Sequence, residues 1–399
     1  MKKIFSFILV ASFAISTMTY AQDTTSKKPE GYKFKDDKRI KTTSCKNQAS
    51  SGTCWSFSTI AFFESELIRM GKGEYDLADM FCVRHAYADK AEKFVRMHGT
   101  INFGGGGAAH DVLDVIKKYG MVPEEAYGGL NYGEKLHNHA ELDAVLKAYI
   151  KVIADDNNKK ISTAWLKGFN GILDAYLGKL PETFTYKGKT YTPRSFGDEL
   201  GLKAENYVEF SSYTHHPFYT KFAIEVPDNW AWGEVNNLPL DEMMKVIDNS
   251  IDNGYTVAWG ADVSEKGFSW RNGVAIVPDE DKSDLQGTER DKWEKLTERE
   301  KQAQLYTFDK PIKEKVITQE MRQVGFDNYT TTDDHGMEIC GIAHDQAGNK
   351  YYIIKNSWGF ENKFQGFFYA SESFVRFKTM DIMVNKEAVP KDIRKKSGL

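Results

Sequence analysis

The stretch Gln48-Ala49-Ser50-Ser51-Gly52-Thr53-Cys54-Trp55 places a cysteine directly before an amphipathic run over residues 56–70. Apolar residues recur in that run at helical spacing, which predicts a helix that begins at the cysteine. A thiol at a helix N-terminus lies near the positive end of the dipole and near unpaired N–H groups, and both favour the thiolate. The amide of Gln48 can donate a hydrogen bond at the same spot. A nucleophile beside such a donor is half of an acyl-transfer site.

A histidine and an asparagine far downstream supply the other half. His335 begins one strand-like run, and a second run ends in Asn356-Ser357-Trp358-Gly359. The segment between them, 344–349, is turn-like, so the two runs are predicted to pair as antiparallel strands that bring His335 close to Asn356. A histidine can accept the thiol proton, and an asparagine amide oxygen can hold its ring in one tautomer. Trp358 can cover that hydrogen bond from water.

Each motif also has a purely structural interpretation. A lone cysteine before a helix is usually a small buried hydrophobe. A lone histidine is usually a satisfied surface or core residue, and Asn-Ser-Trp-Gly can be an ordinary strand end. Because all of them occur in one chain, each in the local context that catalysis needs, the catalytic interpretation is favoured. Cysteine, histidine and asparagine in this order, after a glutamine, resemble the papain-type cysteine peptidases.

The spacing narrows the resemblance to one branch. Cys54 and His335 stand 281 residues apart (335 − 54). Ordinary papain-like enzymes have roughly 130–150 residues there, so about another domain's worth of chain is inserted. Ser51 stands where the common motif has a disulfide-forming cysteine. From about residue 40 to 390 the chain resembles the bleomycin hydrolase/aminopeptidase C branch, on four segments: Asn47-Gln48-x-Ser50-Ser51-Gly52-x-Cys54-Trp55, Leu177-Gly178-Lys179-Leu180-Pro181-Glu182-Thr183-Phe184, Tyr191-Thr192-Pro193-Arg194-Ser195-Phe196, and Phe326-Asp327-Asn328-Tyr329 running into Thr331-Thr332-Asp333-Asp334-His335.

The resemblance implies an α+β fold of the papain-like type. A helical lobe and an antiparallel β lobe enclose a cleft, and a largely helical insertion is added. The chain then divides into five expected parts: a signal peptide over 1–21, a flexible N-terminal segment over 22–42, a helical catalytic lobe with Cys54 over 43–130, the family insertion over 131–250, and a β-rich catalytic lobe with His335 and Asn356 over 251–399.

The N-terminus has the pattern of an export signal. Met1-Lys2-Lys3 precedes an apolar run over 4–15, and Ala21 offers a small residue at the cleavage position. We therefore expect an exported protein, periplasmic or secreted, that matures near Ala21 and has no membrane span afterwards; an uncleaved anchor is the alternative. The formal net charge of −4 gives no support for nucleic-acid binding.

The remaining cysteines do not form a disulfide framework, since the chain of 399 residues contains only 4 cysteines. Buried free thiols are the favoured interpretation for Cys45, Cys82 and Cys340. One disulfide in an oxidising compartment is the alternative.

A glycine run, Phe103-Gly104-Gly105-Gly106-Gly107, precedes a predicted helix over 109–119. Glycines let a substrate backbone approach closely and pair with main-chain groups. The resemblance implies that Gly105 and Gly106 bind the second residue of the substrate. A phosphate cradle is the disfavoured alternative, because the Lys-Ser/Thr pair and a preceding strand are missing.

No metal or other cofactor is expected. His137-x-His139 and His215-His216 are the closest histidine pairs, and neither has a companion ligand set in the sequence. Both pairs are interpreted as surface histidines.

These residues together predict a cysteine peptidase that forms a thioester acyl-enzyme. Cys54 attacks the peptide carbonyl, His335 transfers protons, and Asn356 orients His335. The Cys54 N–H and the Gln48 amide hold the oxyanion. Two tryptophans are assigned supporting roles: Trp55 and Trp358.

The C-terminal segment bears on the kind of peptidase. In the resembled branch the C-terminus lies in the cleft, and its carboxylate helps to select a free substrate amine. Residues 383–390 resemble the start of that tail, and the sequence continues only to Leu399. An aminopeptidase is expected, because the insertion and the catalytic segments match the branch. A cysteine endopeptidase with an open cleft is the first alternative, and a catalytically silent peptide-binding protein is the second. The resemblance implies peptides as partners and a homo-oligomer, often a hexamer.

Overall fold

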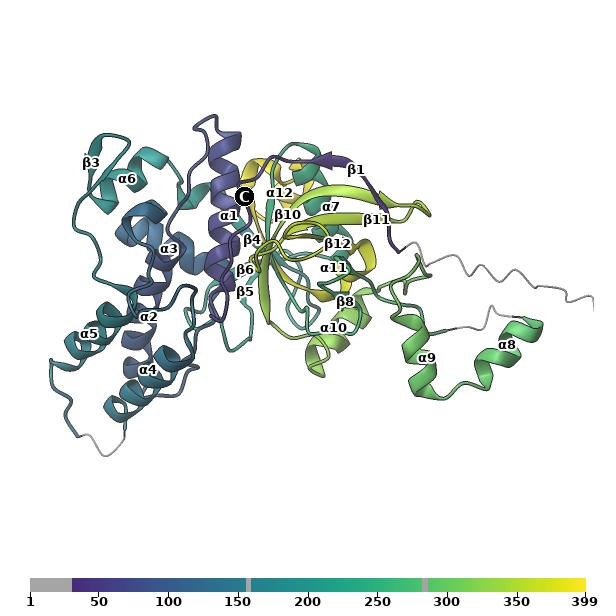
Figure 1. The fold of residues 1–399 in the computed structure, drawn as a ribbon, viewed down its shortest axis with the longest axis horizontal. Coiled ribbons are helices and arrows are strands. Elements are labelled where there is room, and N and C mark those ends of the chain that lie inside the picture. The colour runs from purple at the N-terminus through teal and green to yellow at the C-terminus, as the bar shows by residue number, and fades with distance from the viewer. Residues whose placement is uncertain (1–30, 156–158, 282–285) are drawn as a thin grey trace, which may run out of the picture.

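Two lobes lie side by side in the computed structural model, one helical and one built around a large sheet (Figure 1). The structure describes residues 31–155, 159–281 and 286–399. The expected signal peptide over 1–21 lies outside the described residues. Within the described ranges, no helix has the length and apolar character that a membrane crossing requires.

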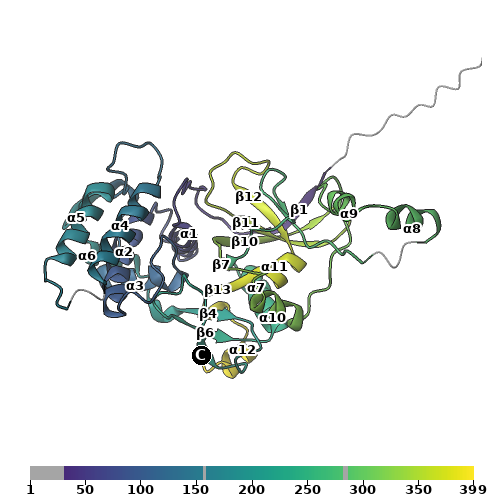
Figure 2. The ribbon, with the colours of Figure 1, turned by 90° about the horizontal axis from the view of Figure 1, so that it is seen from below.

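The helical lobe is built on α1 (Cys54–Arg69), which the sequence predicted over nearly the same residues. Its helices share one apolar core, which includes Phe62, Phe81, Leu142 and Phe169. Most of α1 is buried, because it lies between this core and the sheet of the other lobe (Figures 1 and 2). The lobe also contains α2 (Asp79–Arg96), α3 (Ala109–Tyr119), η1 (Glu124–Ala126), α4 (Ala140–Ile153), α5 (Trp165–Leu177), the β2 (Phe184–Tyr186) and β3 (Lys189–Tyr191) hairpin, α6 (Pro193–Leu200) and η2 (Ala204–Asn206).

The second lobe contains a mixed sheet in which most neighbouring strands are antiparallel. The strands run in the order β5-β6-β4-β13-β7-β10-β11-β12-β9-β8, and β1 pairs with β10. The pairs β4–β6 and β9–β12 are parallel. The strands are β1 (Phe34–Arg39), β4 (Tyr207–Ser211), β5 (Lys221–Ala223), β6 (Glu234–Asn237), β7 (Val257–Ala261), β8 (Phe268–Ser269), β9 (Val274–Ala275), β10 (His335–Asp345), β11 (Lys350–Lys355), β12 (Phe367–Ser371) and β13 (Thr379–Asn385).

Helices around this sheet complete the lobe. Apolar side chains of α7 (Leu240–Asp252), α11 (Glu372–Lys378) and α12 (Lys391–Lys396) join one core with the strands. The remaining elements are α10 (Gln319–Asp327), η3 (Lys386–Ala388), α8 (Gly287–Glu294) and α9 (Glu298–Leu305). Figure 2 shows α8 projecting away from the body of the molecule, as expected for a charge-dense stretch with little apolar surface to bury.

Strand β10 connects the predicted catalytic parts. It pairs antiparallel with β11, as the sequence predicted, in a register that sets Glu338 opposite Lys355. It also pairs antiparallel with β7, where His335 lies opposite Ala261. His335 therefore starts the strand, and Asn356 directly follows the neighbouring strand near the same edge.

Two expected segment boundaries differ from the structure. Residues 34–39, expected within a flexible segment, instead form β1 on β10. The ring of Phe34 stacks on Tyr369 at a centroid distance of 3.9 Å, which anchors this short strand. The segment 131–250, expected as one insertion, is divided between the lobes. Its helices α4 and α5 share the core of α1, whereas β4, β6 and α7 belong to the sheet lobe.

Candidate active site

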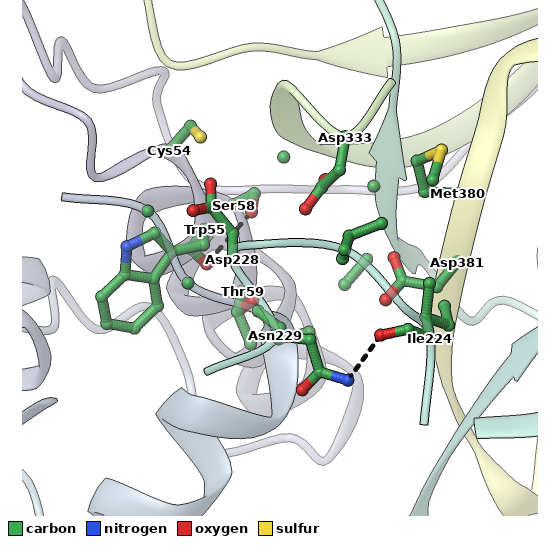
Figure 3. Close-up of a pocket in the computed structure, with 18 of the residues that line it drawn as sticks. Cys54, Trp55, Ser58, Thr59, Ile224, Asp228, Asn229, Asp333, Met380 and Asp381 are labelled. Carbon is green, nitrogen blue, oxygen red and sulfur yellow. Dashed lines mark hydrogen bonds between the residues drawn. The ribbon is translucent and has the colours of Figure 1, made fainter. Parts of the chain in front are cut away.

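Cys54 is the first residue of α1 and lines a cavity (Figure 3). His335, the first residue of β10, lines the same cavity. Residues of both lobes surround it. The fold thus brings together a thiol and an imidazole that are far apart in the sequence.

Gly336 explains how the strand and the helix come so close. A Cβ added at Gly336 would lie 2.6 Å from Ser58 Oγ and 3.3 Å from the Cys54 carbonyl oxygen. A side chain does not fit at such distances, so any other residue would push the start of β10 away from the start of α1. The glycine therefore keeps the elements that carry Cys54 and His335 in contact.

The ring of His335 is held in one orientation by Asn356. His335 Nε2 lies 2.7 Å from Asn356 Oδ1, and both residues are buried. The Ser357 N–H also donates to Asn356 Oδ1 at 2.8 Å, which identifies that atom as the oxygen. Nε2 must then carry the proton, and Nδ1 keeps its lone pair. This is the tautomer that a general base needs when it accepts a proton on Nδ1.

Trp358 covers the other side of the imidazole. Its ring lies 4.6 Å from the His335 ring, at an angle of 32° between the two planes. The rings of Phe268 and Trp270 contact Trp358 edge-on and fix its position. The structure thus places Trp358 where the sequence analysis assigned it, over the histidine that bonds Asn356.

Gln48 is held beside this site by the segment that follows Asn356. Its backbone N–H donates to the Ser357 carbonyl at 2.8 Å, and its Oε1 accepts from the Ser357 hydroxyl at 2.6 Å. One hydrogen of its Nε2 goes to the Ser51 carbonyl at 2.8 Å. An amide nitrogen carries two hydrogens, so the second can donate to an oxyanion. The N–H of Cys54, in the first turn of a helix, has no partner within that helix and can donate beside it.

Burial in the cavity favours the neutral forms of the two reacting groups. The pKa of the Cys54 thiol is raised to about 12, chiefly by desolvation of the thiolate, and the charges of Asp333 and Asp228 add to the rise. Backbone N–H groups, that of Gly336 first, oppose it. Burial lowers the pKa of His335 to about 4. The helix dipole alone predicts a thiolate, but here desolvation and two carboxylates outweigh it.

Four carboxylates that the sequence analysis did not assign line the same cavity: Asp228, Asp333, Asp334 and Asp381, all but Asp334 labelled in Figure 3. Burial, and then the charge of Asp381, hold the pKa of Asp333 well above its usual value. Burial and the charge of Glu209 raise the pKa of Asp381 to about 7. Asp333 could have been found, because it stands two positions before His335. Asp228 and Asp381 carry no sequence signal, since the tertiary fold alone brings them to the cavity.

The glycine run forms one wall of the site. Gly106 lines the cavity, whereas Gly105 is not among the residues that line it. The Gly105 carbonyl instead accepts a hydrogen bond from Trp55 Nε1 at 3.1 Å, which ties the run to α1. Lys90 holds the run from beneath, where its buried ammonium donates to the carbonyls of Gly104, at 2.9 Å, and of Gly106. Trp55 and Lys90 together fix the main chain of the run.

The C-terminal segment lies on the sheet lobe, away from the cavity. Lys245 on α7 pairs with Asp392 at 3.0 Å, and Lys396 pairs with Glu242 of the same helix at 2.5 Å. Leu399 closes the segment with a backbone hydrogen bond of 3.0 Å to Arg394. The residues that line the cavity of Cys54 include none from this segment. Its carboxylate therefore lies outside the site in this structure.

The histidine pair His215 and His216 has a companion that the sequence analysis missed. Glu225 lies 3.0 Å from His215 Nε2 and 2.7 Å from His216 Nε2, because the chain turns back after β5. Gln323 Nε2 donates to Asp327 Oδ1 at 2.9 Å and to His215 Nδ1 at 3.0 Å. His215 Nδ1 is then an acceptor, and its proton lies on Nε2. A ring that donates from Nε2 to Glu225 is a hydrogen-bonded partner and not a ready metal ligand.

The other pair departs from the expected surface position. His139 is fully buried at 0% exposure, since it precedes α4 and packs near Tyr87. Burial lowers the pKa of His139 to about 4, so the ring is neutral. His137 is only partly covered and lies 6.2 Å, between ring centroids, from Phe57.

All four cysteines are free thiols in the described chain: Cys45, Cys54, Cys82 and Cys340. Cys54 is the least buried of them, and the other three are enclosed in the cores. The thiol that faces the cavity is thus also the one that solvent can approach.

Comparisons with known proteins agree on one group of enzymes. A family model described as the Peptidase C1-like family matches residues 83–277 and 287–398. Aminopeptidase C of Lactococcus lactis subsp. cremoris is 22% identical over 387 residues, which cover 87% of this chain and 81% of that protein. Aminopeptidase C of Lactobacillus delbrueckii subsp. lactis is 24% identical, with 89% and 82% covered. Bleomycin hydrolase of Gallus gallus is 21% identical, with 87% and 81% covered.

A solved structure has the same architecture. The crystal structure of PepW from Lactobacillus rhamnosis HN001 superposes with a TM-score of 0.68 at 16% identity, and covers 91% of this chain and 84% of that one. At this identity the likeness concerns the fold alone. It confirms the α+β, papain-like fold that the sequence predicted.

Proposed function

The chain belongs to the Peptidase C1-like family, and from that premise we propose that it is a cysteine peptidase that removes residues from the N-terminus of peptides. The observation that carries the chemistry is the fixed His335 tautomer. Asn356 Oδ1 accepts a hydrogen bond from the Nε2–H of His335, which leaves Nδ1 as the base in the cavity of Cys54. The proteins it resembles over most of its length are aminopeptidases C and bleomycin hydrolases.

The reaction follows from these atoms. The Cys54 thiol gives its proton to His335 Nδ1 as the sulfur attacks the peptide carbonyl, and a tetrahedral oxyanion forms. The Cys54 N–H and the second Nε2 hydrogen of Gln48 stabilise that oxygen. The oxyanion collapses to a thioester, and His335 returns the proton to the leaving amine. A water then loses a proton to His335, attacks the thioester and releases the acid and the thiol.

One observation favours the endopeptidase alternative. Helix α12 pairs with α7 through Asp392 and Lys396, and none of residues 391–399 lines the cavity, so in this structure the segment offers no group to a substrate amine. The cavity itself opposes that alternative, because four carboxylates line it and an ammonium suits such a site. The silent binding protein lacks support, since the expected nucleophile, base and orienting amide are all present.

Export and assembly are further parts of the proposal. The sequence pattern of 1–21 supports a protein that is periplasmic or secreted after cleavage near Ala21. Cell fractionation with N-terminal sequencing of the mature protein tests this directly. The resemblance to bleomycin hydrolases supports a homo-oligomer, and light scattering of the purified protein measures its mass.

The catalytic assignment is tested with a set of unblocked aminoacyl-7-amido-4-methylcoumarins. The wild-type chain should release the fluorophore, and Cys54→Ser should lower kcat by roughly 10³-fold or more, because a hydroxyl is a far weaker nucleophile here. A thiol-directed epoxide should label the peptide that contains Cys54, as read by mass spectrometry. Equal thermal unfolding of the two proteins controls for folding. Full activity of Cys54→Ser would refute the assignment.

A further inference from the structure

One carboxylate lies directly on the glycine run of the active site. A Cβ added to Gly106 would meet Asp228 Oδ2 at 1.9 Å and Asp228 Cγ at 2.3 Å. The Asp228 side chain therefore lies flat on main chain that an extended substrate would otherwise pair with. Asp228 and Cys54 line the same cavity, and Figure 3 shows both.

The loop that carries Asp228 is fixed by its own hydrogen bonds. Asn229 Nδ2 donates to the carbonyls of Ile224 and Gly233, each at 3.0 Å, and its Oδ1 accepts from the Gly233 N–H at 2.8 Å. Trp230 ties the loop to α3 through an Nε1 hydrogen bond of 2.9 Å. Because the loop is held at both ends, the position of the Asp228 carboxylate is already fixed in the absence of a substrate.

Two carboxylates in this cavity have no cation of their own. Asp228 Oδ1 accepts one hydrogen bond, from Asn102 Nδ2 at 3.1 Å. Across residues 31–155, 159–281 and 286–399, neither Asp228 nor Asp333 forms a salt bridge, and Asp333 accepts no side-chain hydrogen bond. The nearby Lys90 ammonium already donates hydrogen bonds to two carbonyls of the glycine run. Partly buried carboxylates without a cation suit a ligand that brings an ammonium.

We propose that Asp228 restricts the enzyme to one residue before the scissile bond, an inference that rests on the proposed peptidase function. Its side chain fills the place on Gly106 where a second upstream residue would lie. Its Oδ2 accepts the N-terminal ammonium of the remaining residue, and Asp333 offers a second acceptor. Residues 391–399 take no part, because none of them lines the cavity.

This arrangement couples substrate recognition to the nucleophile. The charges of Asp333 and Asp228 are among the causes that raise the pKa of the Cys54 thiol. An ammonium bound between them offsets those charges and lowers the free energy of the thiolate. A free-amine substrate then favours proton transfer to His335 in a way that an acetylated one does not.

The test compares the wild-type chain with three variants: Asp228→Asn, Asp228→Ala and Asp228→Glu. Asp198→Asn is the matched control, because Asp198 is an exposed aspartate on α6 outside the cavity. Each protein is assayed on aminoacyl-7-amido-4-methylcoumarins with a free or an Nα-acetylated amine. An unblocked hexapeptide is digested in parallel, and its products are identified by mass spectrometry.

Asp228→Asn should lower kcat/KM on the free-amine substrates by roughly 30-fold or more, because an ammonium loses its buried partner. Its rate on acetylated substrates should not fall. Asp228→Glu should keep part of the preference, and Asp228→Ala should begin to release dipeptides, since the place on Gly106 opens. Iodoacetamide should modify Cys54 faster in Asp228→Asn than in the wild type, while the buried thiols Cys45, Cys82 and Cys340 stay unmodified; damage to the fold would expose those thiols too.

The proposal is overturned if Asp228→Asn keeps the wild-type ratio of free to acetylated rates, or if Asp228→Ala still releases only single residues. Those outcomes leave the peptidase function intact. A wild-type chain that hydrolyses no substrate faster than Cys54→Ser does would instead overturn the proposed function, and the inference with it.

Discussion

The two walls of the active-site cavity differ in how their polar groups are satisfied. On the wall of β10 and β11, His335 and Asn356 are bonded to each other at 2.7 Å, and the neighbouring Ser357 N–H completes the arrangement. On the wall of the glycine run, Asp228 has one amide partner, and no salt bridge joins it to a described residue. The catalytic hydrogen bonds of the first wall, called the complete wall below, form without a substrate, although the buried Asn356 Nδ2 has no hydrogen-bond partner among the described residues. The second, called the incomplete wall, has no ion-paired cation for Asp228 among the described residues.

This difference separates two functions that one cleft has to combine. The complete wall fixes the tautomer of the base, so it determines the chemistry of any substrate. The carboxylate of the incomplete wall binds substrates that have a free amine more tightly, so this wall determines which peptides react. Substitution of His335 or Asn356 should therefore slow all substrates alike, and substitution of Asp228 should change the ranking of the substrates.

The largest effect is expected on the complete wall. His335→Ala should lower kcat by roughly 10²- to 10⁴-fold, because the general base is lost. Asn356→Ala should cost less, roughly 10- to 100-fold, since it removes only the hydrogen bond that orients the base. Both should act equally on free and acetylated substrates, as steady-state kinetics would show. His344→Ala, at the far end of β10, serves as the control and should keep the wild-type kcat. A larger loss of kcat in Asn356→Ala than in His335→Ala would contradict the role of Asn356 as the residue that orients the base.

The pH dependence of thiol modification tests whether the walls act together. With the pKa of Cys54 raised to about 12 and that of His335 lowered to about 4, both groups are neutral between pH 5 and 9, a window that lies between the two values. The thiolate fraction then rises about tenfold per pH unit, and the rate of iodoacetamide labelling of the free enzyme should rise with it. A flat profile below pH 7 would indicate a thiolate–imidazolium pair instead and would contradict this prediction.

A smaller change is expected from Asp333, which stands two residues before His335 on the side of β10 but, like Asp228, forms no salt bridge with a described residue. Asp333→Asn should lower kcat/KM on free-amine substrates several-fold, less than Asp228→Asn does, because Asp228 still meets the ammonium. At a given pH, iodoacetamide should label Cys54 faster, since one charge that opposes the thiolate is gone. Rates with Asp198→Asn provide the baseline. Slower labelling would show that Asp333 does not act through its charge.

No change in selectivity is expected from the C-terminal end. Removal of Gly398 and Leu399 moves the terminal carboxylate, which lies on the sheet lobe and outside the cavity. The ratio of free to acetylated rates should stay within about twofold of the wild type, a range that surface changes rarely exceed. A collapse of that ratio would show that the tail reaches the cleft and that the incomplete wall does not select alone.

The sequence predicted the complete wall far better than the incomplete one. Cys54 begins a helix with clear periodicity. His335 begins β10, and Asn356 directly follows β11, the next strand in the sequence. His335 and Asn356 come together through the pairing of two consecutive strands, and the alternation and turn signals of such strands can be recognised in a sequence. Asp228 reaches the cavity only because the loop around Asn229 and Trp230 folds against α3, and no local pattern encodes such a contact.

Two of the expected segment boundaries differ from the structure for a related reason. The segment 131–250 has helical signals early and short strands later, and nothing in its pattern shows which core each part joins. Strand β6 spans only Glu234–Asn237, too short for a period to be read, yet it extends the sheet beyond β4. Likewise, Glu225 joins His215 and His216 only after the chain turns back.

The central claim is that the cleft cuts one residue from a free N-terminus. Its most direct measurement is the time course of an unblocked hexapeptide and its Nα-acetylated form with the wild-type chain, followed by mass spectrometry. The unblocked peptide should shorten by one residue at a time, and the acetylated peptide should persist. Internal fragments that appear from both peptides at equal rates would contradict the claim.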